Sequence, residues 1–182
     1  MLQKRNMQPL LDLFNRDPLR LRYLLGISRG LKLAHTSVKR DLDALVKRGI
    51  VQRRLERRGK RSFPLYVANE GDALFRQMKK LRNFELLYES GLVDAVADAC
   101  APRVIVVFGS YRRGEDLVES DIDLFVESLP KKIGLSRFER TLGRKIHILF
   151  EEKFGNLGAD LKNNVINGFV LRGYLEAYDA RS

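Results

Sequence analysis

The sequence predicts a mixed α/β (α+β) protein with two domains, and three observations support this expectation. Residues 1–70 combine helical spacing of apolar residues with two extended basic segments. From residue 91 onward, helix and strand patterns alternate, which is typical of a small sheet covered by helices. The charge is divided as well, because residues 1–70 hold 17 Lys or Arg against 6 Asp or Glu, whereas residues 71–182 hold 17 of each.

The basic excess therefore belongs to the first domain, and it predicts contact with nucleic acid phosphates. A solvated charged face without a partner is the alternative. No apolar run approaches the roughly 20 residues of a membrane span, and the first residues lack the apolar core of a secretion signal. We therefore expect a soluble cytoplasmic protein. Its one cysteine, Cys100, cannot form an internal disulfide and is interpreted as a small core residue.

The N-terminal pattern predicts three helices and a basic hairpin. Apolar spacing indicates helices over residues 9–15, 19–25 and 36–48, the last of which is stopped by Gly49. The stretch "IVQRRLERRGKRSFPLYVAN" then predicts two extended segments around the turn at residues 59–61. Arg53 and Arg54 are adjacent in a strand, so only one of them is expected to face a given surface.

The stretch "TSVKRDLDALVKRGIVQRR" resembles the recognition helix and the start of the wing of a winged helix-turn-helix domain, here over residues 1–68. The resemblance implies DNA as a partner and dimers as a common state, so a homodimer is expected; a protein interaction module is the alternative. The implied DNA-binding residues are Ser37, Lys39 and Arg40 on the helix and Arg57, Arg58, Lys60 and Arg61 near the hairpin tip.

Residues 69–89 predict a linker helix, because apolar residues recur there at helical spacing, namely Leu74, Met78, Leu81 and Leu86 with Phe75 and Phe84. Its apolar surface is expected to pack against the second domain, or against the same helix of another subunit. The second domain is predicted over residues 90–182. It has helices over residues 92–100, 133–142 and 157–166, strands over residues 103–108, 122–127 and 145–150, and a last apolar segment at residues 169–171.

The stretch "VIVVFGSYRRGEDLVESDIDLFVE" carries the chemistry. Gly109 allows a phosphate to approach the backbone, Ser110 can donate a hydrogen bond to it, and Arg113 adds positive charge. Asp121 and Asp123 lie two residues apart in an extended segment, so both carboxylates point to one face. Paired carboxylates repel each other unless a cation lies between them, and their oxygens suit Mg²⁺. An acidic turn before a strand is the alternative interpretation.

This Gly-Ser pair followed by Asp-x-Asp on a strand resembles the signature of the nucleotidyltransferase superfamily that includes DNA polymerase beta, and its minimal members most of all. The resemblance implies that Gly109 and Ser110 hold the triphosphate of an NTP, with ATP as the expected substrate, while Asp121 and Asp123 bind Mg²⁺ or Mn²⁺. Active members usually add a third carboxylate from the next strand. In "RKIHILFEE" that position is His147, if Ile146, Ile148 and Phe150 face the core. Glu151 or Glu152 could substitute for it.

Two functions follow as hypotheses. The first is an enzyme that transfers a nucleoside monophosphate to a protein or nucleic acid acceptor, with Asp121, Asp123 and His147 as its catalytic residues. Similar proteins include antitoxins that modify a partner toxin, so a toxin-like protein partner is expected on this hypothesis. The second is a winged-helix transcriptional regulator whose nucleotidyltransferase-like domain only binds a nucleotide or a partner. His147 favours the second, because a histidine is a poor Mg²⁺ ligand.

Overall fold

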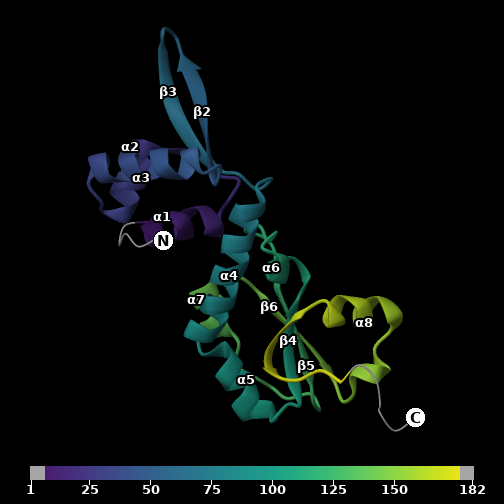
Figure 1. The fold of residues 1–182 in the computed structure, drawn as a ribbon. Helices are drawn as coiled ribbons and strands as arrows, with labels where there is room; N and C mark the ends of the chain where they lie inside the picture. Colours follow the sequence, from purple (N-terminus) through teal and green to yellow (C-terminus); the bar gives the residue numbers. More distant parts are fainter. Residues whose placement is uncertain (1–6, 177–182) are drawn as a thin grey trace. The chain divides into compact units, whose positions relative to one another are not determined.

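The computed structural model describes residues 7–176. The chain divides into two compact units, residues 1–77 and 78–182 (Figure 1). The division falls within α4 (Ala73–Glu89), the helix that was predicted as a linker. Within the described residues, no helix is both long enough and apolar enough to cross a membrane.

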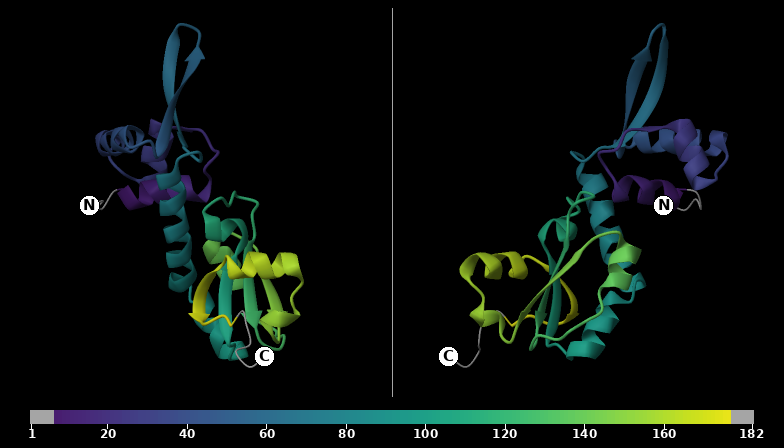
Figure 2. Two further views of the ribbon diagram at one scale, coloured as in Figure 1. Left: turned by 45° about the vertical axis from the view of Figure 1, so that its right-hand side comes forward. Right: turned by 180° about the vertical axis from the view of Figure 1, so that it is seen from behind.

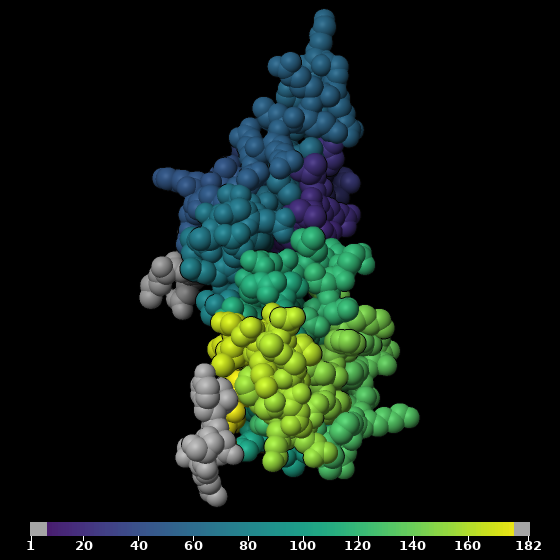
Figure 3. Space-filling view, turned by 90° about the vertical axis from the view of Figure 1, so that its right-hand side faces the viewer, coloured from purple at the N-terminus to yellow at the C-terminus, as the bar shows by residue number. Residues whose placement is uncertain are grey.

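The first unit contains three helices and a small antiparallel sheet. Its elements are α1 (Met7–Arg16), β1 (Arg22–Tyr23), α2 (Leu24–Leu31), α3 (His35–Lys47), β2 (Val51–Arg58) and β3 (Arg61–Ala68). The strand order is β1-β3-β2, and β2 pairs with β3 along its whole length. The predicted third helix and the predicted hairpin are confirmed. Figure 3 shows the hairpin of β2 and β3 projecting from the rest of its unit.

The prediction of a helix over residues 19–25 is wrong. Arg22 and Tyr23 instead form β1 and pair with Tyr66 and Leu65 of β3, and the helix begins only at Leu24. The apolar residues that suggested the helix are largely exposed in the structure. Pairing with β3 therefore outweighs the local helical pattern, as tertiary context often does.

The second unit confirms the predicted alternation of helices and strands. After α4 it contains α5 (Leu92–Cys100), β4 (Val104–Phe108), α6 (Gly109–Arg113), β5 (Ile122–Glu127), α7 (Ser136–Leu142), β6 (Ile146–Glu151), the 3₁₀ turn η1 (Phe154–Asn156), α8 (Ala159–Ile166) and β7 (Phe169–Gly173). The sheet has the order β6-β5-β4-β7. Strands β5 and β6 are parallel, whereas β4 is antiparallel to both of its neighbours. The mixed α/β class is confirmed.

Alternating residues of this sheet bury two different faces, because successive side chains of a strand point to opposite sides. Ile122, Leu124 and Val126 of β5 pack with α5 and α7 in one core. Phe125 of the same strand packs with η1 and α8 in the other core. Figure 2 shows α8 on one side of the sheet and α5 and α7 on the other. The face covered by α8 is the face on which Asp123 lies.

Helix α4 buries part of the apolar set that was predicted. Phe75 and Phe84 are buried, as expected, whereas Leu74 and Leu81 are 38% and 64% exposed. The buried positions in the second unit also include Lys79, Asn83 and Leu87, which recur every four residues. The prediction was incomplete because it followed apolar residues only, whereas the inward side of this helix also carries a lysine and an asparagine.

Candidate active site

The candidate site lies where β5 begins. Asp123 is in register with Phe108 of β4 on one side and with His147 of β6 on the other. Residues in register project to the same face of a sheet, so Asp123 and His147 share a face. The prediction that Ile146, Ile148 and Phe150 face the helical core is confirmed, since all three pack there. His147 therefore occupies the strand position at which a third carboxylate was expected.

The charges of the site act on one another. Partial burial raises the pKa of Asp123 above its usual range, the nearby His147 opposes this effect, and the negative charge of Asp121 adds to it. The ionised form of Asp123 is thus destabilised at neutral pH. A cation bound between the two aspartates would relieve both the desolvation and the repulsion.

Gly109 brings the turn after β4 directly against Asp123. Its φ of +73° lies in the left-handed region that favours glycine, and a Cβ at this position would overlap Oδ2 of Asp123. Ser110 follows as the second residue of α6, a helix whose amides begin beside the carboxylate. The structure therefore brings Gly109 of the predicted phosphate-binding pair against Asp123, one of the two predicted metal ligands. No other residue type allows the backbone to approach Asp123 as closely.

Arg113 lies at the opposite end of α6 from Gly109. Its Nε donates a hydrogen bond of 2.6 Å to Oε2 of Glu115, and both side chains are about half exposed. The carboxylate partner partly neutralises the guanidinium. A nucleotide would have to compete with Glu115 for it.

Glu151 does not take the place of a third carboxylate. It is in register with Glu127 and lies four residues beyond His147 on β6, about 13 Å along the strand. Its Oε1 also accepts hydrogen bonds from the Glu152 amide, at 3.2 Å, and from Nδ2 of Asn156, at 3.0 Å. Over residues 7–176, no three His, Cys, Asp or Glu side chains are grouped as a metal site. Asp121 and Asp123 remain the predicted metal-binding carboxylates at this end of the sheet.

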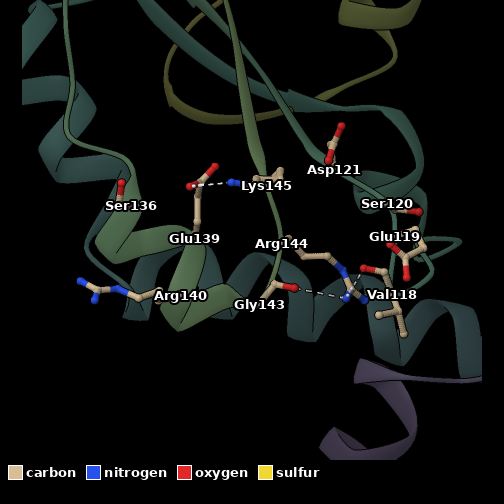
Figure 4. A pocket seen from close by; sticks show the side chains of 10 residues that line it. All are labelled: Val118, Glu119, Ser120, Asp121, Ser136, Glu139, Arg140, Gly143, Arg144 and Lys145. Atoms are coloured by element: carbon tan, nitrogen blue, oxygen red, sulfur yellow. Dashed lines mark hydrogen bonds and ion pairs between the residues drawn. The ribbon is translucent and has the colours of Figure 1, made fainter.

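A pocket of about 610 Å³ opens beside Asp121 (Figure 4). Figure 4 shows α7 on one side of it and the segment that leads into β5 on the other. Lys145 at its rim is 3.5 Å from the carboxylate of Glu139. The residues that line the pocket are Val118, Glu119, Ser120, Asp121, Ser136, Glu139, Arg140, Gly143, Arg144 and Lys145. The sequence pattern did not predict this pocket, because α7 approaches Asp121 only through the fold.

A second feature that the sequence interpretation missed is a buried ionic cluster around Asp116. Lys79, Asp116 and Arg144 have side chains that are 1%, 2% and 5% exposed. The sequence carries a signal for it, namely the polar residues at every fourth position of α4, but nothing in the spacing identifies Asp116 as their partner.

The predicted DNA-binding residues lie on two elements of the first unit. Ser37, Lys39 and Arg40 are in the first two turns of α3, and Arg40 forms an ion pair of 3.0 Å with the buried Asp41. Lys60 is exposed in the turn between β2 and β3, and Arg61 is exposed at the start of β3.

Arg58 is engaged within the hairpin. Its Nε donates to Oε2 of Glu56 at 2.9 Å, one of its terminal nitrogens donates to the Tyr23 hydroxyl at 2.6 Å, and that hydroxyl also donates to Glu56. The hydrogen bond to Glu56 raises the pKa of the Tyr23 hydroxyl, and the contact with Arg58 partly opposes this effect. The positive charge of Arg58 is therefore shared with an intramolecular carboxylate.

Arg53 and Arg54 point to opposite faces of the hairpin, as expected for neighbours in a strand. Arg53 is in register with Tyr66, whereas Arg54 is in register with Leu65. Burial raises the pKa of Tyr66, and the charges of Arg53 and of Asp43 on α3 both act on it. Arg53 therefore lies on the α3 side of the hairpin.

The second unit thus combines a small mixed sheet that has helices on both faces with a glycine turn against the Asp123 carboxylate. Residues 91–175 match the family model described as "Nucleotidyltransferase domain", which supports nucleotidyl transfer as the general function of the second unit. A comparison with curated proteins finds no match.

Proposed function

We propose that the second unit transfers a nucleoside monophosphate from an NTP to an acceptor hydroxyl. The observation that carries the proposal is the contact between Gly109 and Asp123, because a phosphate bound at the glycine turn would lie close to a cation held by that carboxylate. The family match over residues 91–175 supports the same type of reaction. ATP is the NTP that we would test first.

The two aspartates fit a divalent cation that arrives with its nucleotide. Mg²⁺ in proteins is commonly held by one or two carboxylates together with substrate phosphates, so a third protein ligand is not required. When bound, Mg²⁺ or Mn²⁺ would neutralise charge on the reacting phosphates. Asp121 and Asp123 would hold the cation through their carboxylate oxygens.

The remaining steps depend on the chain itself. In the reaction the acceptor oxygen bonds to the α-phosphorus, the bond to pyrophosphate breaks, and the acceptor hydroxyl loses its proton. The amides that begin at Gly109 and the hydroxyl of Ser110 would orient the triphosphate. His147, which shares a face with Asp123, would accept the proton on its imidazole.

Transfer of label tests this proposal. Purified protein is incubated with α-labelled ATP and Mg²⁺ or Mn²⁺, with co-purified proteins and RNA as acceptors. Label should appear on an acceptor and be lost when Asp121→Asn and Asp123→Asn are combined. An Asp98→Asn variant, which changes an exposed carboxylate on α5, should retain it. Absence of label with every NTP and acceptor class would contradict the proposal. Label on a protein would favour the antitoxin-like function, and label on RNA a nucleic acid acceptor.

A second function is favoured by His147 itself. If the absence of a carboxylate at the position of His147 abolishes nucleotidyl transfer, the unit would bind a nucleotide without transferring it. The chain would then act as a nucleotide-sensitive regulator. Equilibrium binding of a fluorescent ATP analogue distinguishes the two, because the regulator predicts saturable binding and no label transfer. Loss of that binding in the Asp121/Asp123 double variant would locate it in this site.

For the first unit we propose a DNA-binding winged helix. Support comes from the element order, the exposed basic hairpin and the localisation of the net charge in residues 1–70. Helix α3 would enter a major groove, and the hairpin would contact a neighbouring phosphate backbone. Duplex affinity measured by fluorescence anisotropy should fall steeply with salt, by about tenfold or more between 50 and 200 mM. A flat salt dependence would contradict the proposal.

A further inference from the structure

The segment between α6 and β5 has a specific task at the candidate site. It begins after α6, whose first residues form the proposed phosphate-binding turn, and it ends with Asp121 just before β5. It has no regular secondary structure of its own. Part of it folds on itself, since the Ser120 amide donates to the Leu117 carbonyl at 3.1 Å and the Leu117 amide donates to the Ser120 hydroxyl at 2.9 Å. A short turn of this kind does not by itself fix where Asp121 lies relative to Asp123.

Asp116 ties this segment to the rest of the unit. Its Oδ1 accepts a hydrogen bond of 2.8 Å from Nδ2 of Asn83 and lies 3.3 Å from Nζ of Lys79, while its backbone carbonyl accepts a further hydrogen bond from Lys79. Asn83 also donates to the Tyr111 carbonyl at 2.9 Å. Helix α4 thereby joins α6 and the segment after it through two buried polar side chains.

Arg144 holds the same segment from the side of β6. One of its terminal nitrogens lies 3.3 Å from Oδ2 of Asp116, and the other donates to the Val118 carbonyl at 3.0 Å, a contact drawn in Figure 4. The carbonyl of the next residue, Lys145, accepts a hydrogen bond of 2.8 Å from the Ile122 amide. Asp121 therefore lies between two main-chain groups that are held by hydrogen bonds. The Val118 carbonyl is bound by Arg144, and the Ile122 amide is bound by Lys145.

We propose that Asp116 is a positioning residue for the candidate site and acts on Asp121 through Arg144 and the main chain of residues 117–121. This inference rests on the proposed role of Asp121 as a metal ligand. The carboxylate of Asp116 orients the Arg144 guanidinium, whose second nitrogen then fixes the Val118 carbonyl. Buried charges are costly unless they are paired, so this geometry has few alternatives.

A purely structural role makes a different prediction. If the cluster only stabilised the unit, its loss would lower the melting temperature and leave the folded site unchanged. If it positions Asp121, the affinity for a divalent cation must fall even where the protein is fully folded. Loss of a supporting residue behind a metal ligand typically weakens metal binding by about 10- to 100-fold.

The test uses Asp116→Asn, which keeps the size of the side chain and removes its charge. Mn²⁺ binding to the full chain, followed by electron paramagnetic resonance well below the melting temperature, should weaken by about tenfold. The matched control is Val96→Ala, which opens a cavity in α5 and destabilises the same unit away from the segment. It should lose thermal stability and keep the wild-type Mn²⁺ affinity. Wild-type Mn²⁺ affinity in folded Asp116→Asn would overturn the proposal.

Two further measurements keep the outcome decisive. If Asp116→Asn does not fold, Arg144→Lys retains the positive charge but cannot contact both Asp116 and Val118, so it should weaken Mn²⁺ binding in the same way. If the wild-type chain binds no Mn²⁺ either alone or in the presence of ATP, the proposed function fails, and amide hydrogen exchange then tests the positioning alone. Exchange at residues 117–122 should accelerate in Asp116→Asn and not in Val96→Ala. Unchanged exchange there would refute the role of Asp116.

Discussion

At the scale of single residues, Gly109 carries two constraints at once. Its positive φ disfavours any side chain, and the space where a Cβ would stand is filled by the Asp123 carboxylate. We expect Gly109→Ala to lower the free energy of unfolding by about 1–2 kcal/mol and to abolish nucleotide binding, since Asp123 must move. Thermal denaturation and nucleotide titration would measure both effects.

Gly134→Ala is the matched control for that substitution. Gly134 has open space where its Cβ would be and no positive φ, and it belongs to the same unit. This variant should bind nucleotide as the wild type does. Equal loss of binding in the two alanine variants would show that the contact with Asp123 is not what matters.

The raised pKa of Asp123 predicts a substitution that stabilises the fold while it damages the site. The pKa of Asp123 in the folded state lies above its unfolded value of 3.8. At a pH between these two pKa values the folded state binds more protons than the unfolded state, so the free energy of unfolding falls as the pH rises through this range. Asp123→Asn should therefore raise the melting temperature at pH 7, by a few degrees at most because the site is open to solvent. At pH 3 the difference should vanish. Calorimetry at the two pH values, with Asp98→Asn as the control, would check the sign.

His147 offers a gain-of-function test of the departure from the family pattern. His147→Asp would place a third carboxylate in register with Asp123. We expect Mn²⁺ to bind on the order of tenfold more tightly, because ligand charge count sets affinity for hard cations. His147→Asn separates the added charge from the lost imidazole, and it should not tighten binding. Weaker Mn²⁺ binding in His147→Asp would show that the site is not built like a metal site with three carboxylates.

At the scale of elements, the hairpin of β2 and β3 has two chemically different faces. Arg53 and Arg57 are in register with Tyr66 and Ser62 and share the face toward α3, whereas Arg58 is held by Glu56 on the other face. If α3 and the hairpin bind one duplex together, the first pair should contribute more to affinity. We expect Arg53→Glu and Arg57→Glu each to weaken duplex binding by about tenfold, and Arg54→Glu to weaken it less. Anisotropy titrations at one fixed salt concentration would compare them.

Elements that are determined by their own local sequence could be predicted. Elements that are determined by contacts with residues distant in the sequence could not. Helix α3 was predicted from the spacing of the apolar residues Val38, Leu42, Leu45 and Val46, of which the first three are buried, and the hairpin from the residues of its turn. Strand β1 was missed because its two residues are strand only by pairing with β3. The polar members of the buried face of α4 were missed because Lys79 and Asn83 are satisfied by Asp116, more than 30 residues away along the chain.

The same distinction applies to the site. Asp121, Asp123, Gly109 and Ser110 could be identified because they lie within one short stretch whose alternation fixes their faces. The position of His147 was predicted from the alternation of side chains along its strand. In the structure His147 is in register with Asp123 on the parallel strand β5. Arg144 and the pocket beside Asp121 depend on how α7 and the start of β6 approach β5, and no local pattern encodes that approach.

At the scale of the whole molecule, the division of charge predicts that the two proposed activities are separable. The first 70 residues carry the whole basic excess, and the proposed nucleotide site lies entirely in the second unit. Combined Asp121→Asn and Asp123→Asn should leave duplex affinity within about twofold of wild type, because both aspartates belong to the second unit and salt screens charges that do not contact the duplex. Arg57→Glu should likewise leave Mn²⁺ affinity unchanged. A large crossed effect in either direction would show that the two units are energetically coupled.

The ionic cluster around Asp116 also bears on how the second unit folds. Its contacts join residues 28 to 37 positions apart, so they form only after α4, the segment before β5 and the start of β6 have come together. If a collapsed chain buries Lys79 or Arg144 against any other surface, the positive charge is removed from water without its carboxylate partner. This desolvation costs several kcal/mol of free energy. The cluster thus destabilises compact but wrongly packed states. The core of the second unit can be buried at low cost only when these three segments pack against one another as in the native structure.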